Sequence, residues 1–182
     1  SDTLPCHLWD GHYGDDMSLA TVSRTLAGLP ATQLHVVRDQ SMVPGVRPGD
    51  WLVVSRAPYR RTAPERADIV SLRDPEGSRK TYLKRVVGLP GEDLEIEDGL
   101  LFVDGRRLQE SYLEGLPANL GLDASAWMLD RRQVFVMGDN RARSRDSRHF
   151  GPVDLDLIVG RAWFRCWPWR SWGPLSVGEK EV

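Results

Sequence analysis

Apolar residues recur at helical spacing in one stretch near the start of the chain. They are Leu19, Val22, Leu26 and Leu29. This spacing puts them on one face of a short amphipathic helix, which Gly28 and Pro30 can end. Arg24 is its one basic residue, which favours packing against the domain over lying on a membrane surface. Together with the polar residues 1–16, the helix forms a predicted N-terminal segment of residues 1–30.

From residue 31 the pattern changes to short runs, bounded by turn residues, that are typical of β-strands. The predicted strands are residues 33–37, 51–55, 69–72, 82–87, 94–97, 100–103, 133–137 and 158–164. Asp98-Gly99 between two of them indicates a tight hairpin. Residues 110–132 are less regular and are interpreted as an insertion. We therefore expect a mainly β fold of antiparallel sheets over residues 31–172, with one or two short helices and a C-terminal tail of residues 173–182.

The composition is that of a soluble globular protein. Of the 182 residues, 41% are hydrophobic and 27% are charged, which fits one domain with appendages. A formal net charge of -2 argues against a general nucleic-acid-binding protein, which is usually basic. The chain has no apolar run of about 18 residues that could span a membrane and no recognisable signal peptide. A protein trimmed of its anchor would look the same.

Cysteine, histidine and lysine narrow the candidate chemistry. Cys6 and Cys166 could form one disulfide or none, and the sequence does not decide. The four histidines do not cluster, and no zinc-type spacing of cysteine and histidine occurs, so we expect no metal and no cofactor. The chain has three lysines, Lys80, Lys84 and Lys180, which limits the search for a lysine with a chemical role.

Two segments place a serine and a lysine where they could react. Ser41 lies in the string Ser-Met-Val-Pro, on a tight connection after a predicted strand, where it can present its hydroxyl or be an ordinary turn residue. Lys84 lies in the predicted strand 82–87, on the same face as Tyr82 and Val86. One face of this strand must be buried. A buried lysine loses solvation, so its pKa falls and it can accept a proton near neutral pH; the alternative is a lysine that reaches solvent at a strand edge.

A third segment, residues 138–152, is polar, glycine-bounded and crowded with charge directly after a predicted strand. A solvated loop would explain its arginines. It explains less well Asp139, Asn140, Asp146 and Ser147, which can bond one another and the backbone to form a rigid polar scaffold.

In this order, the three segments resemble the type I signal peptidase family. The matching strings are Ser-Met-x-Pro…Gly-Asp at 41–50, Lys-Arg-Val-Val-Gly-Leu-Pro-Gly at 84–91 and Gly-Asp-Asn-Arg…Ser-x-Asp-Ser-Arg…Gly at 138–151. Residues 158–162 also resemble that family's closing strand, so the resemblance covers roughly residues 34–170. It implies a signal-peptidase-like catalytic β-fold and a serine endopeptidase. The implied serine–lysine dyad is a variant of the serine-histidine-aspartate catalytic triad.

The resemblance also implies a role for each matched residue. Ser41 attacks the scissile carbonyl, and neutral Lys84 takes the hydroxyl proton and returns it to the leaving amine. Ser144 matches the serine that orients the lysine amine, and Asp146 and Arg148 match an ion pair that braces the site. The backbone N–H of Ser41 supplies one donor to the oxyanion.

The implied substrate is a protein with a signal peptide or propeptide, cut after a small-x-small motif. It would lie extended beside Val37 and residues 82–84, adding a strand of its own. Its small side chains would enter shallow pockets lined by residues such as Met42, Val46 and Leu83. The predicted substrate-binding residues are therefore Val37, Met42, Val46, Tyr82 and Leu83.

The chain departs from the family pattern close to the predicted nucleophile. Asp39 stands two residues before Ser41, where the family usually has a small or hydroxyl residue that can donate to the oxyanion. An ionised aspartate only accepts hydrogen bonds and would repel that charge. Either Asp39 points away, or it is protonated, or the activity is low or specialised. It could also pair with an arginine such as Arg38 or recognise a basic group on one particular substrate. Gly45 replaces the family's usual threonine.

The membrane segment that the family has shortly before the serine is not seen in this sequence. The resemblance implies membrane association on the extracytoplasmic side, and a soluble cytoplasmic maturation protease for one dedicated propeptide is the alternative. Four tryptophans near the C-terminus could contact a membrane surface or pack at the edge of the fold. They are Trp163, Trp167, Trp169 and Trp172.

Two other interpretations stay open. Self-cleaving repressors share the serine–lysine chemistry and a Ser-Met…Gly-Asp string, but they lack the Gly-Asp-Asn…Asp-Ser-Arg segment. They also usually carry a helix-turn-helix, whereas residues 1–30 offer one helix. A non-catalytic binding module on the same fold could be disabled by Asp39. Proteolysis of a peptide with a small-x-small motif would separate such a module from the proteases.

Overall fold

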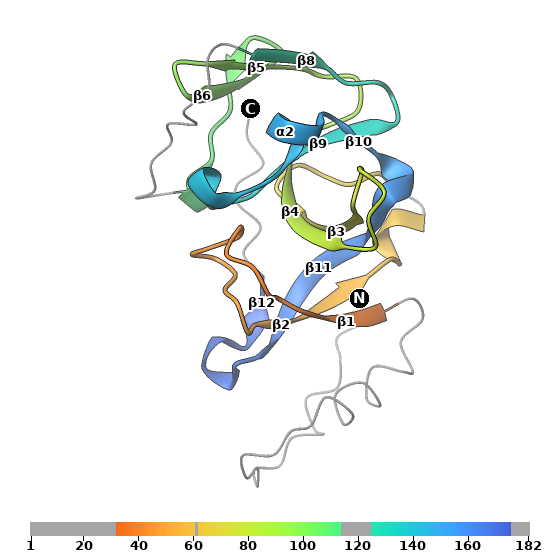
Figure 1. Ribbon diagram of the computed structural model, residues 1–182, viewed down its shortest axis with the longest axis vertical. Coiled ribbons are helices and arrows are strands. Elements are labelled where there is room, and N and C mark those ends of the chain that lie inside the picture. The colour runs from red at the N-terminus through yellow and green to blue at the C-terminus, as the bar shows by residue number, and fades with distance from the viewer. Residues whose placement is uncertain (1–31, 61, 114–124, 176–182) are drawn as a thin grey trace, which may run out of the picture.

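Two antiparallel sheets make up the described part of the protein (Figure 1). The structure is a computed structural model, and it describes residues 32–60, 62–113 and 125–175. Within these residues the mainly β fold of antiparallel sheets is confirmed, with one short α-helix, α2 (Ser147–Phe150). The helix predicted within residues 18–29, Cys6 and residues 114–124 of the predicted insertion lie outside the described residues.

The larger sheet has the strand order β1-β2-β11-β3-β4-β9-β10, with β12 beside β11. Its strands are β1 (Thr32–Val36), β2 (Trp51–Ser55), β3 (Ile69–Arg73), β4 (Thr81–Gly88), β9 (Gln133–Met137), β10 (Val153–Asp154), β11 (Ile158–Trp167) and β12 (Gly173–Pro174). Strand β11 is longer than the pattern predicts. The sheet also continues past residue 172, where the tail was expected to begin, because the Leu175 N–H donates to the Trp163 carbonyl at 3.0 Å and the Leu175 side chain is buried.

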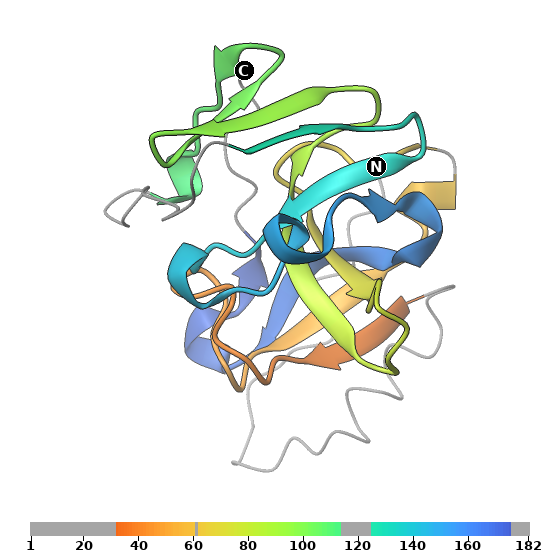
Figure 2. The same ribbon diagram turned by 45° about the horizontal axis from the view of Figure 1, so that its top comes forward.

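The smaller sheet lies across one end of the larger one (Figure 2) and has the order β7-β6-β5-β8. Its strands are β5 (Asp93–Glu97), β6 (Leu100–Val103), β7 (Arg106–Arg107) and β8 (Ser125–Met128). The predicted hairpin joins β5 to β6, and Asp98 and Gly99 have positive φ values of 50° and 75°, as the tight turn requires. Strand β8 lies in the segment expected to be irregular. Its four residues carry no β-branched side chain and its partner β5 is distant in sequence, so the local pattern does not reveal it.

Short 3₁₀ turns lie in the connections between strands. They are η2 (Pro58–Arg60), η3 (Ser111–Leu113), η4 (Arg141–Arg143), η5 (Leu155–Leu157) and η6 (Trp169–Ser171). Turn η4 and helix α2 both follow β9. The third predicted segment is therefore a loop that leaves the larger sheet beside β4, its neighbour in the strand order.

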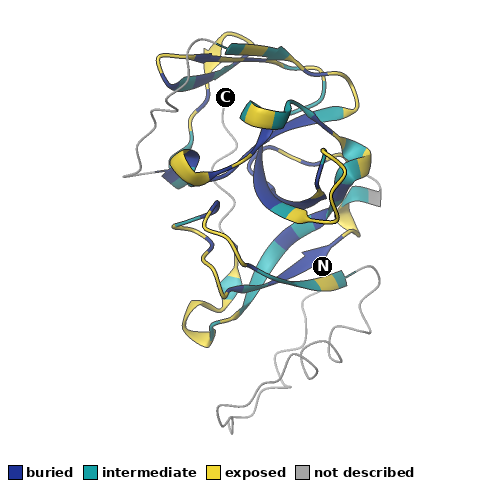
Figure 3. Cartoon of the chain, in the orientation of Figure 1, coloured by how far each residue is buried: buried dark blue, intermediate teal, exposed yellow. Residues whose placement is uncertain are grey.

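The two sheets share an apolar core, and buried residues mark their facing strands in Figure 3. Members of this cluster from both sheets include Val87, Leu94, Ile96, Leu101, Val103, Phe135 and Met137. Fully burying a side chain of this size contributes about 1.5–3 kcal/mol. Gly88 permits the close approach of the sheets, because a Cβ there would lie 2.6 Å from a Leu94 methyl carbon and 2.9 Å from the Phe135 Cβ.

Strand β4 is buried on both faces, whereas alternation alone required one buried face. Every residue from 83 to 88 is buried. The reason is that Val87 packs in one cluster with Leu94 of the smaller sheet, while Val86 belongs to a second cluster within the larger sheet. Strand β9 pairs with β4 only from Arg85 onward. Within the part of the chain that the structure describes, the first half of β4 therefore has a strand partner on one side only.

Candidate active site

The loop between β1 and β2 carries Ser41 to the amine of Lys84. Hydrogen bonds fix its turns, among them Val46 N–H to the Met42 carbonyl at 2.9 Å, and Gly49 takes a positive φ of 93°. Although 43 residues separate Ser41 and Lys84 in sequence, Lys84 Nζ lies 2.8 Å from Ser41 Oγ. Both residues are buried, at 4% and 1% exposure. The predicted nucleophile and base are thus brought together away from bulk water.

The surroundings of Lys84 favour its neutral form. Burial lowers the pKa of this lysine, and the charges of Asp39, Asp146 and Asp139 oppose that shift without cancelling it. The amine also lies 3.0 Å from the Leu83 carbonyl oxygen, to which it donates. Among the described residues it forms no ion pair. A buried amine without a paired carboxylate gives up its proton more readily and can then accept one from a hydroxyl.

Asp146 and Arg148 form the predicted ion pair. Arg148 donates from Nε to Asp146 Oδ1 at 2.8 Å and from a terminal nitrogen to Oδ2 at 2.9 Å, and neither side chain is more than 3% exposed. Asp146 also accepts the Gly138 N–H at 3.0 Å. Burial raises the pKa of Asp146, but the hydrogen bonds and charge of Arg148 outweigh it, and the pKa is lowered. The carboxylate stays charged and braces the segment behind Lys84.

Ser144 is buried in the same segment, but it does not make the predicted contact with the lysine amine. The amine bonds to Ser41 and Leu83 and makes no hydrogen bond to the Ser144 hydroxyl. The hydroxyl packs against Gly138, where an added Cβ would collide with it and with the Ser41 carbonyl oxygen. Gly138 thus lets the third segment approach the nucleophile closely.

Polar groups of the third segment hold the nucleophile loop in place. The Asn140 N–H donates to the Ser41 carbonyl at 2.9 Å, and its side-chain amide donates to the Gln40 carbonyl at 3.1 Å. Arg143 donates to the Gln40 side chain at 3.1 Å. These bonds connect the backbone on both sides of the Ser41 Cα to the third segment, which lies about a hundred residues further along the sequence.

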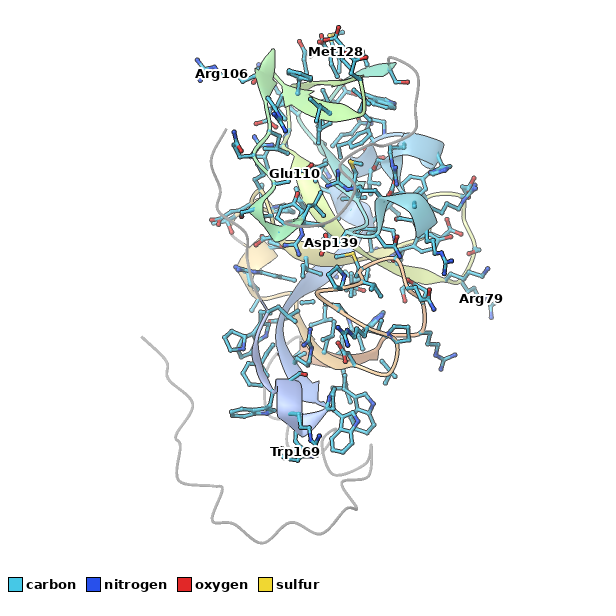
Figure 4. All side chains as sticks on the ribbon, turned by 90° about the vertical axis from the view of Figure 1, so that its left-hand side faces the viewer. Arg79, Arg106, Glu110, Met128, Asp139 and Trp169 are labelled. Atoms are coloured by element: carbon cyan, nitrogen blue, oxygen red, sulfur yellow. The ribbon has the colours of Figure 1, made fainter. Side chains whose placement is uncertain are left out.

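The sequence pattern did not reveal a second buried ion pair, between Arg85 and Asp139. Arg85 donates from Nε and from a terminal nitrogen to the two Asp139 oxygens, both at 2.8 Å, and each side chain is 3% exposed. The Tyr112 ring lies 4.1 Å from the guanidinium, and Glu110 pairs with Arg141 nearby (Figure 4). The sequence did carry one signal for this pair. Arg85 lies inside an apolar predicted strand, and Asp139 follows shortly after another.

Asp39 caps the backbone of the predicted nucleophile. Its Oδ1 accepts the Ser41 N–H at 2.8 Å, so the carboxylate holds the donor that was expected to serve the oxyanion. Partial burial raises the pKa of Asp39, but the hydrogen-bonding groups of Ser41 and the charge of Lys84 outweigh it, and the pKa is lowered. Asp39 therefore does not point away from Ser41 and is not protonated at neutral pH. Among the described residues it forms no ion pair with Arg38.

The predicted substrate-binding residues gather around one apolar cluster beside two open strand edges. Those in the cluster are Val37, Met42, Val46 and Leu83. Tyr82 is half-buried and stacks on Phe150 with 6.2 Å between ring centroids. Among the described residues, strand β1 is the edge of the larger sheet, and the first half of β4 lacks a partner on the β9 side. Both edges have backbone groups that an extended peptide could pair with.

Exposed tryptophans lie at the end of β11 and beyond it. They are Trp167 at 37%, Trp169 at 68% and Trp172 at 57% exposure. Figure 4 shows Trp169 at the opposite end of the molecule from Met128 of the smaller sheet. Within the described residues, no helix has the length and apolar character to cross a membrane, and no group of side chains is arranged to hold a metal ion. Cys166 is unpaired there.

Curated relatives of this chain include signal peptidases from bacteria and a mitochondrial protease. A probable signal peptidase I-1 from Synechocystis is 36% identical over 88% of this chain and 84% of that protein. A signal peptidase I from Bacillus caldolyticus is 34% identical, covering 75% and 80% of the two chains. A mitochondrial ATP-independent inner membrane protease subunit 1b from Arabidopsis thaliana is 38% identical, covering 75% and 70%.

A solved structure and a family model also match. The crystal structure of a signal peptidase I from Enterococcus faecalis is 31% identical, with a TM-score of 0.48, over 55% of this chain and 97% of that one. The family model described as "Signal peptidase, peptidase S26" matches residues 17–167. Because this match spans most of the sequence and the relatives above share more than 30% identity, the chain belongs to the signal peptidase family, peptidase S26.

Proposed function

We propose that this chain is a serine endopeptidase of the signal peptidase I type, which cuts a signal peptide or propeptide after a small-x-small motif. Ser41 is its nucleophile and Lys84 its general base. The observation that carries the proposal is the distance of 2.8 Å between Lys84 Nζ and Ser41 Oγ in a buried setting. Lys80, the other lysine within the described residues, is exposed.

In the first half of the reaction, the lowered pKa of Lys84 supplies a neutral amine near neutral pH. As Ser41 Oγ attacks the scissile carbonyl carbon, Nζ takes the hydroxyl proton and a tetrahedral oxyanion forms. Collapse of this intermediate breaks the C–N bond, and the ammonium returns its proton to the leaving amine. The Leu83 carbonyl, 3.0 Å from Nζ, keeps the amine directed at the hydroxyl.

In the second half, water attacks the acyl ester on Ser41. The water proton passes to Lys84 and then to Ser41 Oγ as the ester bond breaks, which restores the resting enzyme. The charges of Asp146 and Asp139 stabilise the transient ammonium, since each raises the pKa of the lysine. Ser144, Asp146 and Arg148 act as supporting residues that hold the segment behind the dyad.

The substrate binds as an added strand. The edge of β1 leading to Val37 and the unpaired side of β4 at Tyr82–Lys84 offer backbone hydrogen-bonding groups to an extended peptide. Met42 and Val46 are each 1% exposed and Leu83 is 3% exposed. This closely packed cluster leaves little depth for a side chain, which is consistent with small residues at the two specified positions of the motif.

The setting we propose is a membrane surface on the extracytoplasmic side. One relative is named an inner membrane protease. The exposed tryptophans Trp167, Trp169 and Trp172 are of the type that favours a membrane interface. The partner is a protein substrate, and the proposal involves no cofactor and no nucleic acid. A soluble protease for one propeptide remains the alternative setting.

Substitution of the dyad tests the function. Ser41→Ala and Lys84→Ala should each reduce cleavage of an Ala-x-Ala peptide by roughly 10³-fold or more, because either loss removes the activated nucleophile. Lys80→Ala is the matched control, since it removes a lysine close in sequence but exposed. Circular dichroism should show all three variants folded. Loss of activity in Lys80→Ala with retention in Lys84→Ala would contradict the assignment, and an inactive wild type would favour the non-catalytic binding module.

A further inference from the structure

The Asp39 carboxylate occupies a backbone donor beside the nucleophile, and the mechanism above makes no use of this contact. Asp39 Oδ1 accepts the Ser41 N–H at 2.8 Å. In acyl transfer, such an N–H stabilises the oxyanion, and losing one donor lowers the rate by about 10²–10³-fold. The carboxylate also places a negative charge beside the position where negative charge develops. In the free enzyme, the Ser41 N–H is therefore already bonded and is not available to an oxyanion.

Asp39 is charged and accessible to a partner. Its pKa is lowered, the residue is exposed, and among the described residues it makes no ion pair. The charged or titratable neighbours that act on it are Lys84 and His35, and Arg38 precedes it in the chain. Lys84 is buried, and burial lowers the pKa of His35 so that this side chain is neutral near pH 7. None of them draws the carboxylate away from Ser41.

We infer that Asp39 is a specificity residue that recognises a cationic side chain of the substrate, lysine or arginine, close to the scissile bond. This inference rests on the proposed function, since it names a substrate class for the same site. The substrate cation draws the carboxylate into an ion pair and frees the Ser41 N–H, which then donates to the oxyanion. A substrate without the cation leaves the donor occupied and is cut slowly.

Two substrate positions can deliver the charge. The Asp39 carboxylate bonds to the Ser41 N–H, so in the proposed binding mode it lies beside the scissile bond, within reach of side chains on either side of it. In the proposed binding mode, the small residues of the motif face the apolar cluster that contains Met42 and Val46. This leaves the x position of the motif and the first residue after the cut as the sites where a long cationic side chain has room.

The test uses Ala-x-Ala peptides that differ at one of these two positions, with lysine, glutamine or glutamate. For the wild type, we expect kcat/KM for the lysine peptide to be roughly tenfold above that for the glutamine peptide at one position, with glutamate lowest. Most of the gain should lie in kcat, because freeing an oxyanion donor acts on the transition state, whereas a simple binding contact would change KM. The preference should shrink as salt is added.

Variants of Asp39 separate its charge from its hydrogen bond. Asp39→Asn keeps an oxygen that can accept the Ser41 N–H but loses the charge, so the lysine preference should disappear. Asp39→Ala loses both, so the glutamine peptide should be cut faster than by the wild type. Asp39→Arg should reverse the preference in favour of glutamate. Glu95→Gln, an exposed acid of the smaller sheet, is the control and should keep the wild-type preference.

Equal cleavage of lysine and glutamine peptides by the wild type would overturn the inference while leaving the proposed function intact. A preference that survives in Asp39→Asn, or one that lies in KM alone, would also overturn it. If the wild type and Ser41→Ala were equally inactive on every peptide, the proposed function would fail and the inference with it. The two failures are therefore distinguishable in one set of measurements.

Discussion

The two sheets of this protein differ in where their charged side chains lie. In β5 of the smaller sheet, exposed acids alternate with the buried Leu94 and Ile96, and the core beneath is apolar. In β4 of the larger sheet, Lys84 and Arg85 are both buried in the middle of an apolar strand. The smaller sheet has the pattern expected of a stable half-buried sheet. The larger sheet has the pattern expected of a site that needs charged groups out of water.

The way the buried charges are paired explains what each one does. Arg85 pairs with Asp139 and Arg148 with Asp146, so each of these buried side chains has a partner of opposite charge that offsets the cost of its burial. Lys84 has no ion pair among the described residues, and an isolated buried charge costs several kcal/mol. It therefore tends to lose its proton. The paired charges keep the loops in place, whereas the unpaired Lys84 is the residue for which we propose proton transfer.

Removing one member of a buried pair should produce the largest difference between the sheets. Asp146→Ala leaves Arg148 and the Gly138 N–H without their partner, and it should lower the free energy of unfolding by about 3–5 kcal/mol. Glu95→Ala in β5 removes an exposed charge and should change it by no more than about 0.5 kcal/mol. Urea denaturation at pH 7 measures both. Similar values for the two variants would mean that the Asp146 pair is not buried as described.

Adding a methyl group at Gly138 should give the next largest effect. Its Cβ would collide with the Ser144 side chain and the Ser41 carbonyl oxygen, so Gly138→Ala should lower the free energy of unfolding by about 1–3 kcal/mol and reduce kcat by displacing Ser41. Gly45→Ala is the matched control, because a Cβ there meets its nearest atom at 3.6 Å, an ordinary contact. Thermal denaturation and peptide cleavage should leave the Gly45 variant close to wild type.

Local signals were enough to predict most strands and the contact of Ser41 with Lys84. The alternation and turn residues around Asp98-Gly99 specify a hairpin whose partners are adjacent in sequence. Ser41 and Lys84 were found because each lies in a recognisable string, and the order of the strings places them in one family. In both cases the information needed lies within a short stretch of chain.

Features that depend on contacts between distant segments could not be predicted in the same way. The burial of both faces of β4 depends on the smaller sheet, which the chain forms later. The pairing of Arg85 with Asp139 joins residues 54 positions apart. The contact of Asp39 with the Ser41 N–H is local, but it depends on a loop conformation that the residue types alone do not specify. The same applies to the Ser144 hydroxyl, whose expected partner bonds elsewhere.

Replacing Lys84 should change the free energy of unfolding by less than the two substitutions above. As pH falls, it should stabilise the protein relative to the wild type. Lys84→Met keeps the length of the side chain and removes the buried amine, so at pH 9 the free energy of unfolding should stay within about 1.5 kcal/mol of wild type. The pKa of Lys84 is lower in the folded protein than in the unfolded chain. Between these two pKa values the unfolded chain binds more protons, so wild-type stability falls as pH falls. The variant should gain on the wild type over that range.

Cleavage should be abolished in Lys84→Met throughout, which separates the chemical role of the lysine from its effect on the fold. Urea denaturation of both proteins at several pH values measures the difference. A wild type that gains stability relative to the variant as pH falls would show that Lys84 is stabilised in its charged form, contrary to an unpaired buried amine.

The smallest expected effect is a shift of the pH–rate profile when Asp39 loses its charge. Wild-type kcat should rise with pH as Lys84 loses its proton, with an acid limb below the usual lysine range because the pKa of Lys84 is lowered by burial. Asp39 opposes that lowering and is the largest of the opposing charges. Asp39→Asn should therefore move the acid limb of kcat to lower pH, by less than the shift that burial itself produces.

Glu95→Gln supplies the comparison, because Glu95 belongs to the smaller sheet and is not among the main groups that shift the pKa of Lys84. Its acid limb should coincide with that of the wild type. A shift to higher pH in Asp39→Asn would contradict the role assigned to the Asp39 charge, which raises the pKa of Lys84. An acid optimum in the wild type would instead indicate a carboxylate as the base, and Asp39, which accepts the Ser41 N–H, would be the first candidate.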